Sequence, residues 1–141
     1  MEYLRKIFKE AMSHPRIVAL SVGTRPDCLG EEVLDLLEEL NRIKPVWIEL
    51  GLQTTMKNSS VHQKGISAFL LDQALENLRK RNIEVIVHTI LGLPGESREE
   101  ILETMRYLNK KDIQGIKLQL LHVLKGTDLA YDLSCRKISG L

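Results

Sequence analysis

The sequence predicts an α/β fold in which parallel strands form part of a TIM-type barrel. Helical and strand patterns alternate at intervals of roughly thirty residues, which is the length of a βα unit. The predicted strands also carry apolar residues on one face and small or polar residues on the other. This pattern favours a barrel interior over a doubly wound sheet, whose strands are covered by helices on both faces. No linker or low-complexity stretch divides the 141 residues, so we expect one domain over 1–141.

The elements follow one another as a helix and then four strands separated by helices. The first helix is indicated by apolar residues at helical spacing, namely Leu4, Ile7, Phe8 and Ala11. Strands are predicted at about 17–22, 46–52, 83–90 and 115–122. The intervening helices are indicated by periodic apolar residues in 33–40, 71–78 and 101–108. Ser97 and Glu100 have the spacing of a capping box at the start of the last of these. Such alternation implies right-handed crossovers and a parallel sheet.

One face of the predicted sheet gathers small and polar side chains near the carboxyl ends of the strands. Its members are Ser21, Gly23, Glu49, Gly51, Gln53, His88, Lys117 and Gln119. Buried charged groups without partners are costly, so we expect this face to form the wet, functional mouth of the barrel. The alternative is that these groups only pair with one another or with water.

Composition gives no support to several classes of function, although the net charge does not exclude RNA. The formal net charge is +1, which gives no electrostatic case for nucleic acid or for a membrane surface. Apolar runs are short and the first residues are charged, so we expect no membrane segment and a cytoplasmic location. The two cysteines, Cys28 and Cys135, are far apart and form no disulfide framework.

Four strand ends, taken in order, resemble a known family. They read SVGTRPDC at 21–28, ELGLQT at 49–54, HTILGLPGES at 88–97 and IKLQLLHVLKGT at 116–127. Together they resemble the later part of the radical S-adenosylmethionine barrel. The similarity is to an uncharacterised bacterial branch related to the elongator catalytic subunit and, more distantly, to oxygen-independent coproporphyrinogen oxidase. The resemblance implies a parent Fe-S oxidoreductase that uses S-adenosylmethionine and a [4Fe-4S] cluster to form a 5′-deoxyadenosyl radical.

The resemblance also implies a set of residues around the cofactor. Gln53 falls in the nucleoside pocket, and the turn at Gly92 lies near the adenine. Lys64 stands where relatives have an arginine facing the carboxylate of the cofactor; lysine keeps the charge but lacks the bidentate fork. His88 stands where relatives have an aspartate that binds the ribose. The full set of expected cofactor-binding residues is Ser21, Gly23, Glu49, Gln53, Lys64, His88, Gly92 and Leu121.

The cluster ligands of the family are absent from this sequence. The family holds its cluster with C-x3-C-x2-C, because soft thiolate ligands suit iron–sulfur centres. Two cysteines cannot supply three ligands. We therefore expect a fragment that lacks the N-terminal cluster-binding βα units and is inactive alone. Its partner would be the missing N-terminal half, and the exposed first strand could drive self-association.

Two other hypotheses stay open at this point. A degenerate half-barrel could bind a nucleoside or RNA without catalysis; similarity to the elongator subunit suggests RNA only by analogy of fold. A metal-dependent hydrolase could use Glu49, His88 and His122, although their spacing matches no known zinc motif. The substrate is not indicated by the sequence.

Overall fold

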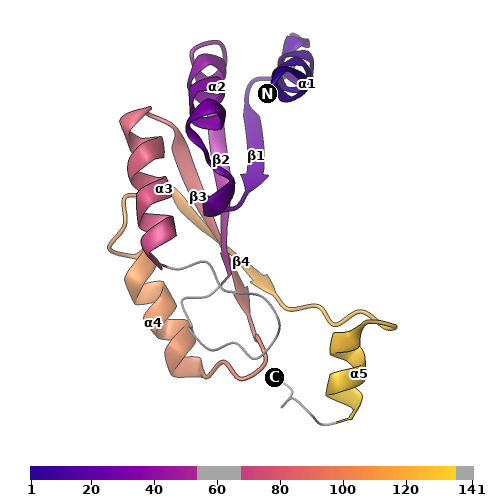
Figure 1. Cartoon of the computed structure of the whole chain (residues 1–141). Helices are drawn as coiled ribbons and strands as arrows, with labels where there is room; N and C mark the ends of the chain where they lie inside the picture. The colour runs from indigo at the N-terminus through magenta and orange to yellow at the C-terminus, as the bar shows by residue number, and fades with distance from the viewer. Residues whose placement is uncertain (54–67, 136–141) are drawn as a thin grey trace.

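A computed structural model describes residues 1–53 and 68–135, and it confirms an α/β fold built on one parallel sheet (Figure 1). In chain order the elements are α1 (Glu2–Ser13), β1 (Leu20–Thr24), a short 3-10 helix (Pro26–Cys28), α2 (Glu31–Asn41), β2 (Val46–Gln53), α3 (Ala68–Lys80), β3 (Glu84–Leu91), α4 (Arg98–Leu108), β4 (Gly115–Leu120) and α5 (Asp128–Ser134). The strands pair in parallel in the order β1-β2-β3-β4. The sequence order of the strands is therefore also their order in space.

The first strand starts later than the sequence predicted. The predicted segment was 17–22, whereas β1 runs from Leu20 to Thr24. The Leu20 N–H donates to the carbonyl of Pro45 at 2.9 Å, and the register continues with Leu20 opposite Val46. Because β2 begins only after Pro45, residues 17–19 have no neighbouring strand in the described part of the chain.

The last strand ends earlier than predicted. The predicted segment was 115–122, whereas β4 ends at Leu120, opposite Leu91 at the end of β3. Leu121 and His122 therefore lie beyond the strand. The two central strands agree with their predicted bounds to within one residue.

The hydrophobic core lies between the sheet and the helices. On β2 and β3 every second side chain is almost fully buried, and these residues are Ile48, Leu50, Leu52, Val85 and Val87. They share the core with leucines of α2 and α3, namely Leu34, Leu36, Leu37, Leu40, Leu71 and Leu78. Removing this apolar surface from water is the main stabilising contribution, and it fixes which face of each strand turns away from the helices.

The apolar face of β4 is not covered to the same extent. Ile116, Leu118 and Leu120 follow the same alternation as the buried residues of β3, yet they are 40%, 57% and 64% exposed. In Figure 1, α5 lies away from the sheet beyond the end of β4. Among the described residues, β1 and β4 are the two edges of the sheet.

No helix in the ranges that the structure describes combines the length and the apolar character needed to cross a bilayer.

Candidate functional site

The polar face predicted from the alternation is present on the side of the sheet that turns away from the core. Along β1 the exposure alternates, with Ser21 and Gly23 exposed between half-buried neighbours. Along β3 the half-buried His88 alternates with buried Val87 and Thr89. Because all four strands are parallel and in register, their polar side chains share one surface.

Four side chains, one from each strand, meet on this surface, and three of them surround the carboxylate of the fourth, Glu49. Ser21 Oγ donates to Glu49 Oε1 at 2.7 Å, and Lys117 Nζ donates to Oε2 at 3.3 Å. His88 Nε2 lies 2.6 Å from the same Oε2. The ring N–H of His88 does not point along this line, so the contact is a close charge–dipole or ion-pair approach rather than an aligned hydrogen bond.

The convergence keeps Glu49 ionised. The hydrogen bonds from Ser21 and Lys117, together with the close approach of His88, lower the pKa of the Glu49 carboxyl from 4.5 to about 2, against an opposing effect of desolvation. The Glu49 and His88 side chains are only 22% and 21% exposed, whereas Lys117 is 50% exposed. The surface therefore presents a fixed negative charge that is partly shielded and a positive charge that solvent or a ligand can reach.

Glycines leave room beside this carboxylate. Gly23 lies directly opposite Glu49 in the register of β1 and β2, and a Cβ placed on Gly23 would meet nothing within 4 Å. Gly51 follows Glu49 on the same face, and its nearest such contact is the Thr24 carbonyl oxygen at 3.8 Å. A ligand could thus approach the backbone of the sheet next to Glu49 without displacing a side chain.

The turn after β3 contains two glycines at positive φ and leads into a capped helix. Gly92 and Gly95 adopt positive φ values of 82° and 80°, which favour glycine. Ser97 and Glu100 form the predicted capping box at the start of α4: Ser97 Oγ accepts from the Glu100 N–H, and Glu100 Oε2 accepts from the Ser97 N–H. Gly92 therefore lies at the carboxyl end of β3, where a barrel places its site.

Leu121 has its backbone donor already in use. The Leu121 N–H donates to the Leu91 carbonyl at 2.9 Å, which extends the β3–β4 pairing by one bond past the strand. A ligand at this position would therefore find this N–H already engaged.

The loop after β1 is fixed by its own charges. Arg25 donates two hydrogen bonds to Asp27, at 3.0 and 2.7 Å, and Pro26 between them is buried. An ion pair between two of its own side chains therefore holds this loop.

Two expected site residues have side chains that lie outside the described part of the structure. Gln53 is the last residue of β2 and pairs with Thr89 after a register shift that follows Gly51, but its side chain is outside the described part of the structure. Lys64 lies outside the described residues altogether. The structure thus brings together Ser21, Glu49 and His88, with Gly23 beside them, and places Gly92 and Leu121 at the carboxyl ends of their strands.

Lys117 belongs to the site, although the sequence analysis did not include it among the expected cofactor-binding residues. The alternation placed it on the polar face, in the same register as His88. Its contact with Glu49, two strands away, is what joins it to the site.

The described residues do not fit a metal centre. Within 1–53 and 68–135 no group of three or more His, Cys, Asp or Glu side chains is arranged to hold a metal ion. Cys28 and Cys135 are both exposed and unpaired as disulfides. The hypothesis of a metal site built from Glu49, His88 and His122 therefore gains no support, and neither does ligation of an iron–sulfur cluster by this part of the chain.

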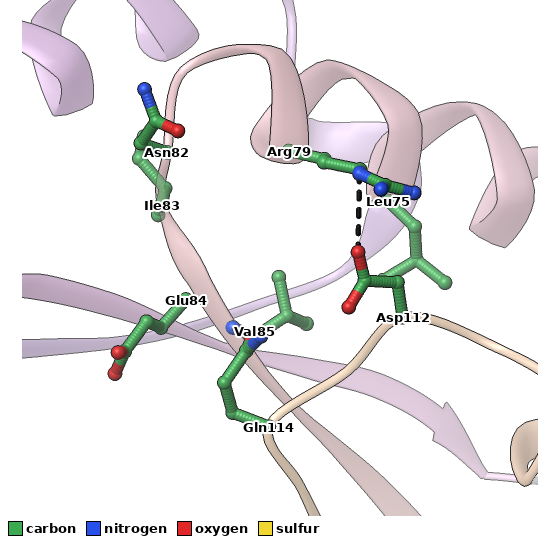
Figure 2. A pocket seen from close by; sticks show the side chains of 8 residues that line it. All are labelled: Leu75, Arg79, Asn82, Ile83, Glu84, Val85, Asp112 and Gln114. Atoms are coloured by element: carbon green, nitrogen blue, oxygen red, sulfur yellow. Dashed lines mark hydrogen bonds and ion pairs between the residues drawn. The ribbon is translucent and has the colours of Figure 1, made fainter.

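A separate hollow of about 290 Å³ lies at the amino-terminal ends of β3 and β4 (Figure 2). Its wall includes Leu75, Val85 and Gln114, and Arg79 Nε contacts Asp112 Oδ2 across it at 3.1 Å. Barrel sites form at the carboxyl ends of strands, and contacts at the amino-terminal end serve stability. The Glu49 face is therefore the candidate functional site.

Comparison with known proteins agrees with this architecture. The model of the Radical SAM superfamily matches residues 1–108. The uncharacterized protein YtqA of Bacillus subtilis is 41% identical over 138 residues, which cover 92% of this chain and 40% of YtqA. The chain thus spans about two fifths of the length of this curated relative.

Solved structures show the same fold. The archaeal Elp3 of Methanocaldococcus infernus, solved with an N-terminal deletion, superposes with a TM-score of 0.74 at 25% identity, covering 99% of this chain and 33% of Elp3. The radical S-adenosylmethionine methyltransferase TsrM of Kitasatospora setae, solved with cobalamin and a [4Fe-4S] cluster, gives a TM-score of 0.59 at 20% identity, covering 84% of this chain and 24% of TsrM. From the family match over most of its length, the chain belongs to the radical SAM superfamily.

Proposed function

We propose that this chain is the S-adenosylmethionine-binding part of a larger radical SAM Fe-S oxidoreductase, and that the polar face of its sheet holds the cofactor. The observation that carries the proposal is the convergence of Ser21, His88 and Lys117 on Glu49, beside the open space over Gly23. The remaining residues that we assign to the cofactor are Gln53, Lys64, Gly92 and Leu121. A polar, hydrogen-bonding surface with an open backbone approach suits a nucleoside that carries hydroxyl groups and an amino acid.

The iron–sulfur cluster would be held elsewhere in the parent protein. Three cysteine thiolates are needed, and the sequence has two, which are exposed and distant in sequence. Reductive cleavage of S-adenosylmethionine to a 5′-deoxyadenosyl radical, acting on an unknown substrate, is accordingly proposed for the parent only. We assign no step of that reaction to this chain, and we expect the chain alone to be inactive.

The open edge at β1 is where we place the missing N-terminal half. Within the described part of the chain β1 is a sheet edge, and Ile17 and Val18 just before it are 40% and 77% exposed. An exposed strand edge with apolar flanks favours pairing with another strand. In the parent this would be the preceding βα unit of residues upstream. For the chain alone, the same edge favours self-association.

A half-barrel that binds a nucleoside or RNA without catalysis is the second candidate. The observation that favours it is the shortage of cysteine ligands together with an intact polar face. The reading frame upstream of the Met1 codon in the source genome separates the two candidates. A continuous frame with C-x3-C-x2-C supports the enzyme, whereas a ribosome-binding site and start codon at Met1 support the half-barrel.

The exposed thiols of Cys28 and Cys135 support a reducing compartment, and we propose the cytoplasm.

Calorimetric titration with S-adenosylmethionine tests the binding face directly. Gly23→Val adds a side chain beside Glu49 at a position where a Cβ meets nothing within 4 Å, so it should leave the fold intact and weaken binding by about tenfold or more. Ser13→Val, on the exposed end of α1, adds the same side chain far from the site and should bind as the wild type does. Equal binding by Gly23→Val and wild type would refute the assignment of the face.

A further inference from the structure

Glu49 has little capacity left to bind a ligand. A carboxylate has about four lone-pair positions for hydrogen-bond donors. Oε1 accepts from Ser21, and Oε2 accepts from Lys117 and lies against His88 Nε2. These contacts come from three different strands and hold the carboxylate from both sides. About one lone-pair position, on Oε1, is left for a donor from a ligand.

Lys117 has the opposite character. Its ammonium group has three donors, and among the described residues Glu49 is its hydrogen-bond and ion-pair partner. The side chain is half exposed, and the 3.3 Å contact with Glu49 is longer than a typical charge-assisted hydrogen bond. Lys117 is paired in register with His88 on β3, which in turn lies opposite Gly51 on β2. Along this row a polar ligand would meet donors from Lys117 and His88 above a glycine.

We propose that Lys117 is the anion-binding group of the site, taking a carboxylate or phosphate of the bound molecule, and that Glu49 is a positioning residue that holds Lys117 and His88. This inference rests on the proposed function for the location of the ligand, and it names the chemistry by which the face recognises it. The carboxylate or phosphate would complete the hydrogen bonding of the ammonium on the side away from Glu49. The acidic group belongs either to the methionine end of S-adenosylmethionine or to the second substrate.

A titration of the 141-residue chain with inorganic phosphate, followed by the backbone amide resonances of β4, tests the charge chemistry without a cofactor. The wild type should show saturable shifts near Lys117. Lys117→Met should weaken binding by about tenfold or more, because a hydrogen bond to a charged group is lost, and Lys117→Arg should retain it. Lys117 is half exposed, so its replacement should leave the fold intact, which thermal unfolding checks.

Glu49→Gln separates the positioning role from a ligand role. Glutamine keeps an oxygen that can accept from Lys117, but it removes a negative charge 3.3 Å from the ammonium, so phosphate affinity should rise. If Glu49 itself bound the amino group of the cofactor, the same substitution would lower the affinity for S-adenosylmethionine. The proposal is overturned by any of three results: no saturable phosphate binding by the wild type, equal phosphate binding by Lys117→Met and the wild type, or weaker binding of either phosphate or S-adenosylmethionine by Glu49→Gln.

Calorimetry with S-adenosylmethionine and its decarboxylated analogue identifies the source of the acidic group. If the methionine carboxylate is the ligand, Lys117→Met should lower the affinity for S-adenosylmethionine about tenfold and leave the affinity for the analogue unchanged. If the acidic group belongs to the substrate, both nucleosides should bind Lys117→Met as they bind the wild type, while phosphate binding is lost. Failure of the wild type to bind either nucleoside would refute the proposed function, and the phosphate result would still stand on its own.

Discussion

Replacing Glu49 by glutamine should destabilise the chain in a pH-dependent way. In the folded chain the carboxylate is stabilised by Ser21, Lys117 and His88, and its pKa is lowered from 4.5 to about 2. Glutamine keeps the shape of the side chain but removes the charge. The difference between the two proteins therefore reports the interaction of this one carboxylate with its three neighbours.

The magnitude follows from the size of the pKa shift. One unit of difference between the folded and unfolded pKa corresponds to about 1.4 kcal/mol, so this shift sets an upper value of about 3 kcal/mol. The Glu49 side chain is 22% exposed and the Lys117 side chain 50%, so screening by water reduces the effect. We expect a loss of about 1–3 kcal/mol in the free energy of unfolding near neutral pH. Because the folded pKa is the lower one, the contribution is present above the unfolded value of 4.5 and is lost as the pH falls towards 2.

Urea unfolding of both proteins, at about pH 7 and again at about pH 2, measures this difference. The gap between wild type and Glu49→Gln should be largest at neutral pH and should shrink in acid. Glu39→Gln is the matched control, since the pKa of Glu39 is also lowered to about 2, by Lys9 and Arg5, but on an exposed surface. Its effect should be smaller. A gap for Glu49→Gln that is absent at neutral pH, or constant from neutral pH to acid, would refute the reasoning.

Three further predictions concern the scaffold of the site. Leu50→Ala empties a fully buried position next to Glu49 and should cost about 2–5 kcal/mol of unfolding free energy, whereas Leu124→Ala, at a position 67% exposed, should cost little; chemical denaturation compares them. Ser97→Ala removes the hydroxyl of the capping box and should cost about 1 kcal/mol in the same assay, with an unchanged loss in the Glu100→Ala background as the sign that the two groups do not act together. Gly92→Ala places a residue with a Cβ at a positive φ of 82°, so the free energy of unfolding should fall by about 1–2 kcal/mol and the melting temperature should fall with it. A melting temperature equal to that of the wild type would contradict the expected backbone strain.

Much of the fold could be predicted because the period of the sequence is unambiguous in its centre. The segments around Leu50 and Val87 alternate between buried and polar positions, and a period of two fixes the faces of a strand. The bounds of β1 could not be predicted in the same way. Ile17 and Val18 look like strand residues, but pairing starts only where Pro45 offers a carbonyl to Leu20.

The site was only partly accessible from the sequence. Parity placed Ser21, Glu49 and His88 on one face, and the structure shows that they meet. The role of Lys117 depends on a contact across two strands, which the pattern within a single strand does not reveal. The exposure of Leu118 was likewise not visible, because the alternation predicts which face a residue occupies but not whether another element covers that face.

The central claim is that the polar face around Glu49 binds S-adenosylmethionine, and a titration of the isotopically labelled chain with this cofactor tests it most directly. Saturable shifts should appear in the amide resonances of Gly23, Gly51, His88 and Lys117, which share the face. No saturable shift, or shifts confined to the opposite edge of the sheet around Arg79, would contradict the claim.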